Sequence, residues 1–186
     1  GQTGLKNPEF IFVDDVSSDN SVEIIRRMTE GVKNVTIVTN PYNRGISARI
    51  NQGIALAKGK WTRMLDSDDI FPLDSTAKML AVAGETGAEM IYGCFTKTGK
   101  DPKELENCRL EEFDYQYVPD AMSGVLNGRF TRMGQLIKTD VLQKAGGADE
   151  RAFIQDESIP LRAALYAKGI VKMTANVVLV PKEIGN

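Results

Sequence analysis

Two short apolar segments that each end in a cluster of acidic residues constrain the fold of this chain more than any other feature of its sequence. Phe10–Val13 is followed directly by Asp14 and Asp15, and Trp61–Leu65 leads into the segment Asp66–Asp69. The continuous apolar run Phe10–Val13 is typical of a strand buried on both faces of a parallel sheet, and Trp61–Leu65 is expected to be a second strand. The carboxyl ends of such strands meet at one edge of an open sheet, where ligands bind. We therefore expect both acidic clusters to face one crevice.

Segments with helical spacing alternate with the apolar segments in the first half of the chain. Helices are expected at Ser21–Glu30, from Ile46 to Ala57 and from about Asp74 to Ala83, and further strands at Val35–Val38 and Ala88–Phe95. The charged segment 97–118 is expected to be a mobile insertion over one edge of the sheet. This order predicts an α/β fold in which a mainly parallel sheet is flanked by helices. A chain of 186 residues is long enough for one such domain, over residues 1–186.

The composition excludes several classes of function. The net charge is −2 and no polybasic run occurs, so we expect no nucleic-acid partner. No apolar run approaches the roughly 20 residues of a membrane span, so no transmembrane segment is expected. The two cysteines, Cys94 and Cys108, are interpreted as free thiols of a cytoplasmic protein. Because the chain has no histidine, acid–base and metal chemistry must use carboxylates.

The acidic clusters themselves indicate a divalent cation. Several carboxylates in one crevice repel each other unless a positive group lies among them. An all-oxygen site suits Mg²⁺ or Mn²⁺, and Mg²⁺ is typically held by one or two carboxylates together with substrate phosphates. The sequence Asp66-Ser67-Asp68 therefore indicates a diphosphate ligand. The competing interpretation is that these polar runs are ordinary turns and helix caps.

Four motifs, in this order, resemble those of family 2 glycosyltransferases of the GT-A fold. The segment from Val13 to Ser21 is similar to the family's "VDDGSxDxT", and the segment from Asn43 to Gly53 to its "NxG…ARNxG" helix. Asp66–Asp69 with Pro72 resembles "LDxDDxxxP". Gly147–Glu150 and Phe153–Asp156 resemble the "G.DE…ED" region, although here Gln155 precedes Asp156. The resemblance implies a three-layer GT-A domain with residues 10–95 as the nucleotide- and metal-binding half and 96–186 as the acceptor-side half.

The resemblance also implies a nucleotide-sugar donor, usually with uridine diphosphate, and assigns residues to the nucleotide. Asp15 would accept a hydrogen bond from the nucleobase, and Asp14 would support the same loop. Arg44 would help to hold the nucleotide, or is a solvated loop arginine. Asp66 would lie near the ribose.

The family's chemistry is carried by the remaining acids. Asp68 would bind Mn²⁺ or Mg²⁺ that bridges the diphosphate, and Asp69 would share that function. Asp156 would deprotonate the acceptor hydroxyl, with Glu157 beside it as a rival. The implied reaction is transfer of a hexosyl or hexosaminyl group with inversion, in surface polysaccharide or glycan synthesis. The acceptor would be a saccharide or a lipid-linked glycan, which would place the protein in the cytoplasm or at the inner face of the membrane.

The chain departs from the family pattern at two places. Val16 stands where the family usually has glycine, and because a β-branched residue disfavours positive φ we expect the turn to be built differently. Nothing before Phe10 resembles the family's first strand, so the domain is interpreted as N-terminally truncated. The loss of that strand would expose two sheet edges. We expect compensation by a rearranged sheet, a swapped segment or a partner chain, including self-association through these edges.

Three other functions are alternatives. A sugar-nucleotide pyrophosphorylase would need an early glycine-rich phosphate loop, which is not found here. A dinucleotide-binding domain would show a GxGxxG after the first strand, and none follows Phe10–Val13. A non-catalytic nucleotide-binding fragment or pseudoenzyme stays open.

Overall fold

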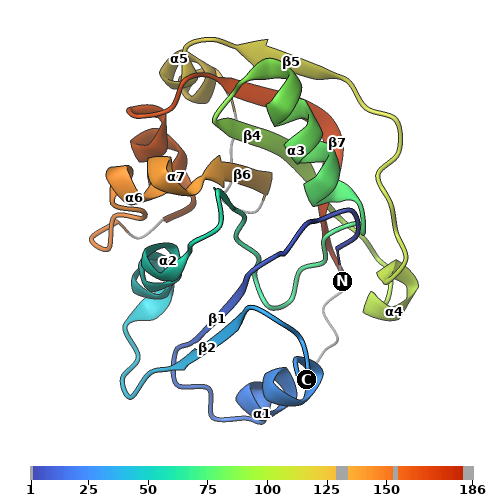
Figure 1. Cartoon of the computed structure of the whole chain (residues 1–186), viewed down its shortest axis with the longest axis vertical. Helices are drawn as coiled ribbons and strands as arrows, with labels where there is room; N and C mark the ends of the chain where they lie inside the picture. The colour runs from blue at the N-terminus through green and yellow to red at the C-terminus, as the bar shows by residue number, and fades with distance from the viewer. Residues whose placement is uncertain (1, 129–133, 153–154, 182–186) are drawn as a thin grey trace.

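The structure of the chain, a computed structural model, describes residues 2–128, 134–152 and 155–181, with the side chains of residues 155 and 156 outside the description (Figure 1). Strands and helices alternate along the chain. They are β1 (Phe10–Asp14), α1 (Ser21–Met28), β2 (Val35–Thr39), α2 (Gly45–Leu56), β3 (Trp61–Thr62), α3 (Ser75–Thr86), β4 (Met90–Lys97), α4 (Pro102–Leu105), β5 (Tyr115–Val118), α5 (Ala121–Leu126), β6 (Gln135–Lys138), α6 (Thr139–Ala145), α7 (Gln155–Ala164) and β7 (Ile170–Val180). The expected α/β class is confirmed.

The described strands form two sheets instead of one. β1 pairs with β2 in parallel, from Phe10 opposite Val35 to Asp14 opposite Thr39. The larger sheet has the order β3-β6-β4-β7-β5. In it β4 and β7 are parallel, whereas β3 with β6, β6 with β4, and β5 with β7 are antiparallel. Strand pairing is therefore mixed.

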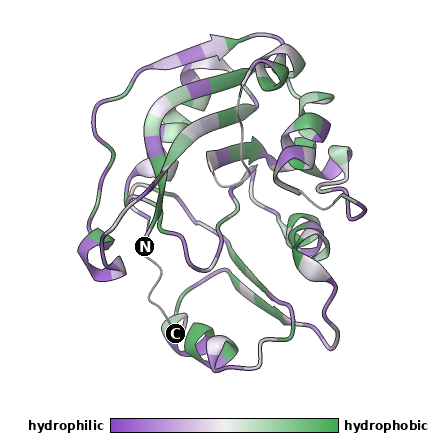
Figure 2. Ribbon diagram, turned by 180° about the vertical axis from the view of Figure 1, so that it is seen from behind, coloured by the Kyte–Doolittle hydropathy of each residue, from purple (hydrophilic) through white to green (hydrophobic). Residues whose placement is uncertain are grey.

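The larger sheet is covered by helices on both faces. Successive strand residues point to opposite faces, so Met90 and Ile91, both fully buried, enter two different clusters. Met90 packs with residues of α5, α6 and α7, and Ile91 packs with residues of α3. Figure 2 shows the hydrophobic stretches along these strands. Burial of such a side chain contributes about 1.5–3 kcal/mol, so these two layers hold the core.

The small sheet has much less cover. No residue between 2 and 47 is buried, and helix α1 has no buried residue, with Met28 74% exposed. In the described part of the chain, β1 hydrogen-bonds to no strand other than β2. Among the described strands, the sheet is thus divided between β1 and β3. The loss of a first strand stays a prediction. Which kind of compensation covers these edges stays a prediction.

Helix α2 joins the two sheets. It lies over β1, where Gly53 faces Val13, and it also contacts α6. After α2 ends, the backbone N–H groups of Lys58 and Gly59 donate to Oε2 of Glu9 at 2.8 and 3.2 Å. Glu9 directly precedes β1, and Gly59 lies two residues before β3, so the starts of the two strands lie close together.

Two expected segments differ in the structure. The strand expected at Trp61–Leu65 ends at Thr62, because the next residue, Arg63, turns its guanidinium toward α3 and β7, where it donates to Ser75 Oγ at 2.7 Å and Val177 O at 2.6 Å. The segment 97–118 was expected to be a mobile insertion over one edge of the sheet. It contains helix α4 and strand β5, and β5 is itself the edge strand of the larger sheet, beside β7.

Glu89 ties three elements together at the start of β4. Its carboxylate accepts from Lys138 Nζ and from the backbone N–H of Lys168, both at 2.8 Å. Burial raises the pKa of Glu89, but the hydrogen bonds and charges of Lys138 and Lys168 outweigh it and hold the pKa below the ordinary 4.5. A carboxyl with a depressed pKa stabilises the folded state above its unfolded pKa, and this stabilisation is lost as the pH falls through the folded pKa.

We therefore expect Glu89→Gln to lower the free energy of unfolding by about 1.5 kcal/mol at pH 7, because charge-assisted hydrogen bonds are lost. Below pH 4.5 the difference from the unmodified chain should shrink, since Glu89 itself becomes neutral. Urea denaturation at pH 7 and pH 3.5 measures both effects, with the exposed Glu30→Gln as the control. A difference that stays constant with pH would contradict this function of the Glu89 charge.

Candidate functional site

Asp15 follows β1 and is held by the start of α2. Its Oδ1 atom accepts from the backbone N–H of Arg44 at 3.0 Å and from Arg49 Nε at 2.6 Å, and its Oδ2 accepts from the N–H of Gly45 at 2.9 Å. The side chains of Arg49 and Asp15 are only 11% and 22% exposed. The N-terminal end of a helix presents free N–H groups to anions, so α2 positions this carboxylate.

These donors keep Asp15 ionised. Partial burial raises the pKa of Asp15, but the hydrogen bonds from Arg44, Arg49 and Gly45 and the charge of Arg49 lower it further, so the net pKa lies below its ordinary 3.8. An ionised carboxylate has about four acceptor positions, and three are used here. Asp15 therefore keeps the capacity to accept one hydrogen bond from a ligand.

Asp14 shapes the turn that carries Asp15. Its carboxylate accepts from the backbone N–H groups of Val16 and Ser17 at 3.1–3.3 Å, and its carbonyl accepts from Asn40 Nδ2 at 2.7 Å. Val16 has a φ of 68°, in the left-handed region. The expectation that valine would force a different turn was wrong. The bonds from Asp14 hold the backbone in a conformation that a β-branched residue disfavours.

A hollow of about 420 Å³ is lined mainly by polar side chains, among them Arg44 and Arg49, which both bind Asp15, although Asp15 itself does not line it. The lining residues are Asn40, Pro41, Tyr42, Arg44, Ala48, Arg49, Asn51, Gln52 and Glu150. Arg44 Nη2 contacts Glu150 Oε2 at 3.1 Å, with the two side chains 63% and 44% exposed. An exposed ion pair contributes little stability, about 0–1 kcal/mol, so Arg44 can exchange Glu150 for a ligand anion.

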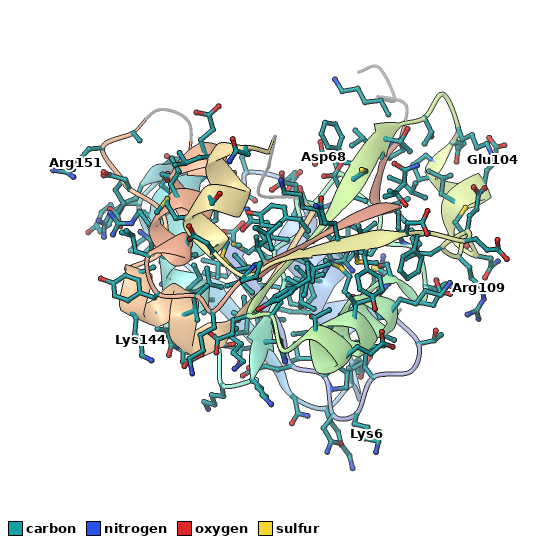
Figure 3. The ribbon with its side chains drawn as sticks, turned by 90° about the horizontal axis from the view of Figure 1, so that it is seen from above. Lys6, Asp68, Glu104, Arg109, Lys144 and Arg151 are labelled. Atoms are coloured by element: carbon teal, nitrogen blue, oxygen red, sulfur yellow. The ribbon has the colours of Figure 1, made fainter. Side chains whose placement is uncertain are left out.

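The second acidic cluster follows β3 in a tight turn. The N–H of Asp69 donates to the carbonyl of Asp66 at 3.2 Å, and the next residue, Ile70, exchanges hydrogen bonds with Leu179. Within this turn Asp66 is half-buried, Asp68 is exposed and Asp69 is 9% exposed. In Figure 3 Asp68 lies in the upper part of the view and Lys6 in the lower part. The turn thus presents Asp68 to solvent and turns Asp69 inward.

The two clusters make separate contacts. Asp15 is bound by α2, whereas Asp68 projects from the turn after β3, and the one crevice expected for both stays a prediction. In the part of the chain that the structure describes, no group of three or more acidic or sulfur-bearing side chains is arranged to hold a metal ion. Mg²⁺ and Mn²⁺ do not need such a cage when substrate phosphates supply ligands. The exposed carboxylate of Asp68, a hard oxygen donor, fits that mode of binding.

The expected base, Asp156, is the second residue of α7, and its side chain lies outside the described residues. Its neighbour Glu157 is exposed. The loop before α7 is bound to α2. Asn51 donates to Ala148 O at 3.0 Å and to Glu150 Oε1 at 3.1 Å, and accepts from Ala148 N at 2.7 Å. The segment that leads to Asp156 is therefore attached to the helix that holds Asp15.

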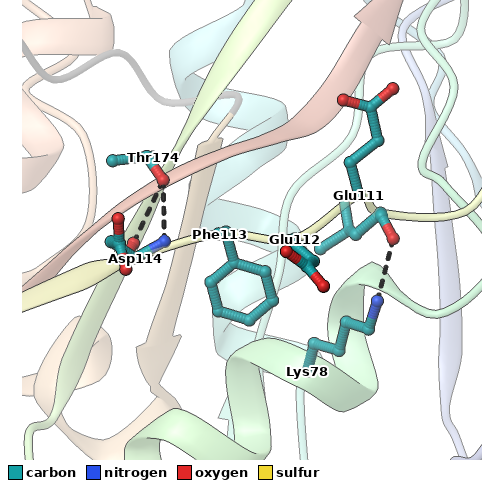
Figure 4. A pocket seen from close by; sticks show the side chains of 7 residues that line it. Lys78, Glu111, Glu112, Phe113, Asp114 and Thr174 are labelled. Carbon is teal, nitrogen blue, oxygen red and sulfur yellow. Dashed lines mark hydrogen bonds between the residues drawn. The ribbon is translucent and has the colours of Figure 1, made fainter.

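A second hollow, of about 600 Å³, lies away from the acidic turns, between α3 and the segment before β5 (Figure 4). Lys78 Nζ donates there to Leu110 O at 2.9 Å, and Thr174 exchanges hydrogen bonds with Asp114. None of the expected site residues lines it. It plays no part in the site described above.

Comparison with known proteins identifies the family. The profile of Glycosyl transferase family 2 matches residues 2–146. This chain belongs to that family. The uncharacterised glycosyltransferase YibD of Escherichia coli K12 is 30% identical over 89% of this chain and 46% of YibD. The glycosyltransferase GlyG of Streptococcus pneumoniae serotype 4 is 25% identical over 97% of this chain and 63% of GlyG.

Solved glycosyltransferase structures share the fold. TarS of S. aureus, residues 1–349 in complex with UDP-GlcNAc, superposes with a TM-score of 0.71 at 17% identity, covering 96% of this chain and 50% of TarS. The mannosyltransferase PcManGT of Pyrobaculum calidifontis, in complex with GDP-Man and Mn²⁺, gives 0.66 at 18% identity, covering 95% and 49%. The expected GT-A fold is confirmed. The chain spans 35–63% of three curated family 2 relatives.

Two features of this family 2 domain were not assigned from the sequence. Arg49 and Asn51 were read only as part of a motif, although Arg49 is the ion-pair partner of Asp15 and Asn51 binds the loop before α7. The available signal was an arginine one helical turn after the helix start, on the side that faces the preceding acidic turn.

Among the described residues, no helix is long and apolar enough to cross a membrane.

The strained turn gives a stability prediction. Val16→Gly should raise the free energy of unfolding by about 1 kcal/mol. Glycine adopts positive φ without the steric cost that valine has there, and this gain exceeds the cost of glycine's larger entropy in the unfolded chain. Val16 is 46% exposed, so little packing is lost. Urea denaturation measures the change. Asn34→Gly, at φ 59°, is the matched control and should gain less, since asparagine tolerates this region; an equal or smaller gain at Val16 would contradict the strain.

Proposed function

We propose that this chain forms the donor-binding and catalytic part of a glycosyltransferase that moves a sugar from a uridine diphosphate sugar to an acceptor hydroxyl with inversion. The observation that supports this most directly is the ionised carboxylate of Asp15, fixed by three N–H donors beside a polar hollow. Such a carboxylate suits the N–H of a uracil ring, because one acceptor position stays open. TarS, which has the same fold, was solved with UDP and with UDP-GlcNAc.

The basic and acidic side chains around the hollow suit the rest of the donor. Arg44 is exposed and only weakly paired, so its guanidinium is free to turn toward a diphosphate. Asp66 is proposed to lie near the ribose, and Asp14 to hold the turn. Asp68, together with the inward-facing Asp69, would hold Mn²⁺ or Mg²⁺ at the diphosphate. When bound, this cation offsets the negative charge that develops on the leaving group.

Removal of the proton from the acceptor hydroxyl is assigned to Asp156. In an in-line displacement the acceptor oxygen attacks the anomeric carbon as the bond to the diphosphate oxygen breaks, and the electron pair leaves with UDP. A carboxylate on the acceptor side takes the hydroxyl proton as the new bond forms. With no enzyme nucleophile between donor and product, the anomeric configuration inverts. The acceptor is proposed to be a saccharide or a lipid-linked glycan, in glycan or polysaccharide synthesis.

The metal function is tested with Asp68→Ala. Calorimetric titration of UDP should give weaker binding than in the unmodified chain when Mn²⁺ is present, by about tenfold, and the same binding in EDTA. Asp140→Ala, which removes an exposed carboxylate on α6, is the control. Equal loss with and without Mn²⁺, or no loss at all, would remove Asp68 from the metal site.

The base is tested with Asp156→Asn. Turnover of the preferred UDP-sugar should fall by about 10² or more, while UDP affinity in Mn²⁺ changes little. Glu157→Gln, one residue further along α7, separates the two candidates. If the Glu157 variant loses turnover and the Asp156 variant keeps it, the assignment moves to Glu157.

A further inference from the structure

Gln135, the first residue of β6, is a fully buried amide without a hydrogen-bond partner. Its relative exposure is 0%, and among the described contacts neither Nε2 nor Oε1 has a partner. Burying an amide without hydrogen bonds costs folding free energy, whereas an apolar side chain of similar shape does not. An unpaired buried amide therefore needs an explanation outside the stability of the free protein.

The register of the larger sheet places Gln135 beside the second acidic turn. Gln135 pairs with Tyr92 of β4, and two residues further along β6 Ile137 pairs with Thr62 of β3. The ladder stops at Thr62, but Met64 packs against the cluster that contains Tyr92 and Ile137, and Asp66 follows Met64 by two residues, about 7 Å of extended chain. A Cβ on Gly134 would overlap the carbonyl of Gly93, so the chain just before β6 lies in close contact with the middle of β4.

The side chain of Gln135 lies on the face of the sheet that α7 covers. Residues two apart in a strand share a face, and Ile137 packs with Met90, Tyr92 and the α7 residue Ile159. Helix α7 begins at Gln155 and carries Asp156. The amide thus lies on the face of the sheet that α7 covers, in the strand next to β3, which leads into the turn of Asp66 and Asp68. In an in-line displacement the transferred sugar must lie between its diphosphate and the base.

We propose that Gln135 hydrogen-bonds a ring hydroxyl of the transferred sugar and helps to select that sugar. This proposal rests on the proposed glycosyltransferase function. An amide both donates and accepts, which matches a sugar hydroxyl, and a site built to bond a hydroxyl discriminates strongly against a sugar that lacks it. The bond that the free protein lacks would then form with the donor.

The test uses Gln135→Met, which keeps the side-chain length and removes the amide. Thermal unfolding of the unmodified chain is measured in Mn²⁺ with UDP alone and with UDP-glucose, UDP-galactose, UDP-N-acetylglucosamine and GDP-mannose. The sugar nucleotide that raises the melting temperature most beyond the shift given by its nucleotide alone is then titrated against each variant. Gln116→Met, at an exposed position on β5, is the matched control.

We expect Gln135→Met to raise the melting temperature of the free protein by about 2–4 °C, because an unpaired buried amide is removed. Affinity for UDP alone should stay the same, and affinity for the preferred UDP-sugar should fall about tenfold. The difference between the two proteins should disappear with deoxy donors, because a sugar that lacks the contacted hydroxyl should bind both proteins equally.

An unchanged affinity for the donor in Gln135→Met would overturn the proposal. So would a lower melting temperature in both Gln135→Met and Gln135→Leu, because the amide would then support the fold. If neither UDP nor any donor shifts the unmodified chain, the proposed function itself fails, and that result is distinct from the failure of Gln135 alone.

Discussion

The contact between Asn51 and Ala148 is the constraint on which the arrangement of the site depends. One amide accepts from Ala148 N at 2.7 Å and donates to Ala148 O at 3.0 Å, so it fixes the loop before α7 from both sides. The same helix, α2, holds Asp15 through Arg49, two residues or about half a turn before Asn51. Because a helix is stiff over this length, the Asp15 turn and the loop toward Asp156 keep a fixed separation although the two sheets do not share a hydrogen bond.

The alternation of strands and helices was predictable, but the division of the sheet was not. Apolar runs and helical spacing predicted β1, β2, α2 and α3, because those signals are local. Strand pairing depends on contacts between distant residues, and nothing local predicts that β6 enters antiparallel between β3 and β4. The strand at Trp61 was predicted three residues too long, since the apolar run contains Arg63, whose buried guanidinium leaves the ladder.

The candidate site divides in the same way. The sequence predicted which carboxylates end the strands, because a motif records residue types, and it could not predict their partners. The negative charge of Asp15 is paired with Arg49, which lies 34 positions later, and only the folded chain brings the two residues together. The conformation of Val16 was wrongly predicted because the intrinsic preference of valine was weighed alone. Two hydrogen bonds to Asp14 outweigh that preference, because a strained backbone conformation persists only where surrounding contacts hold it.

Two polar side chains, Arg63 just after β3 and Gln135 in β6, have different surroundings. Arg63 donates to Ser75, Thr76 and Val177 and lies 3.4 Å from the Phe71 ring centre. Burial lowers the pKa of Arg63 to about 9, so it stays charged at neutral pH. Arg63 thus has a function in the free protein, as a bonded cation behind the turn. Gln135 has no comparable bonds, so its polarity serves the free protein in no way, and this difference is what points to a ligand.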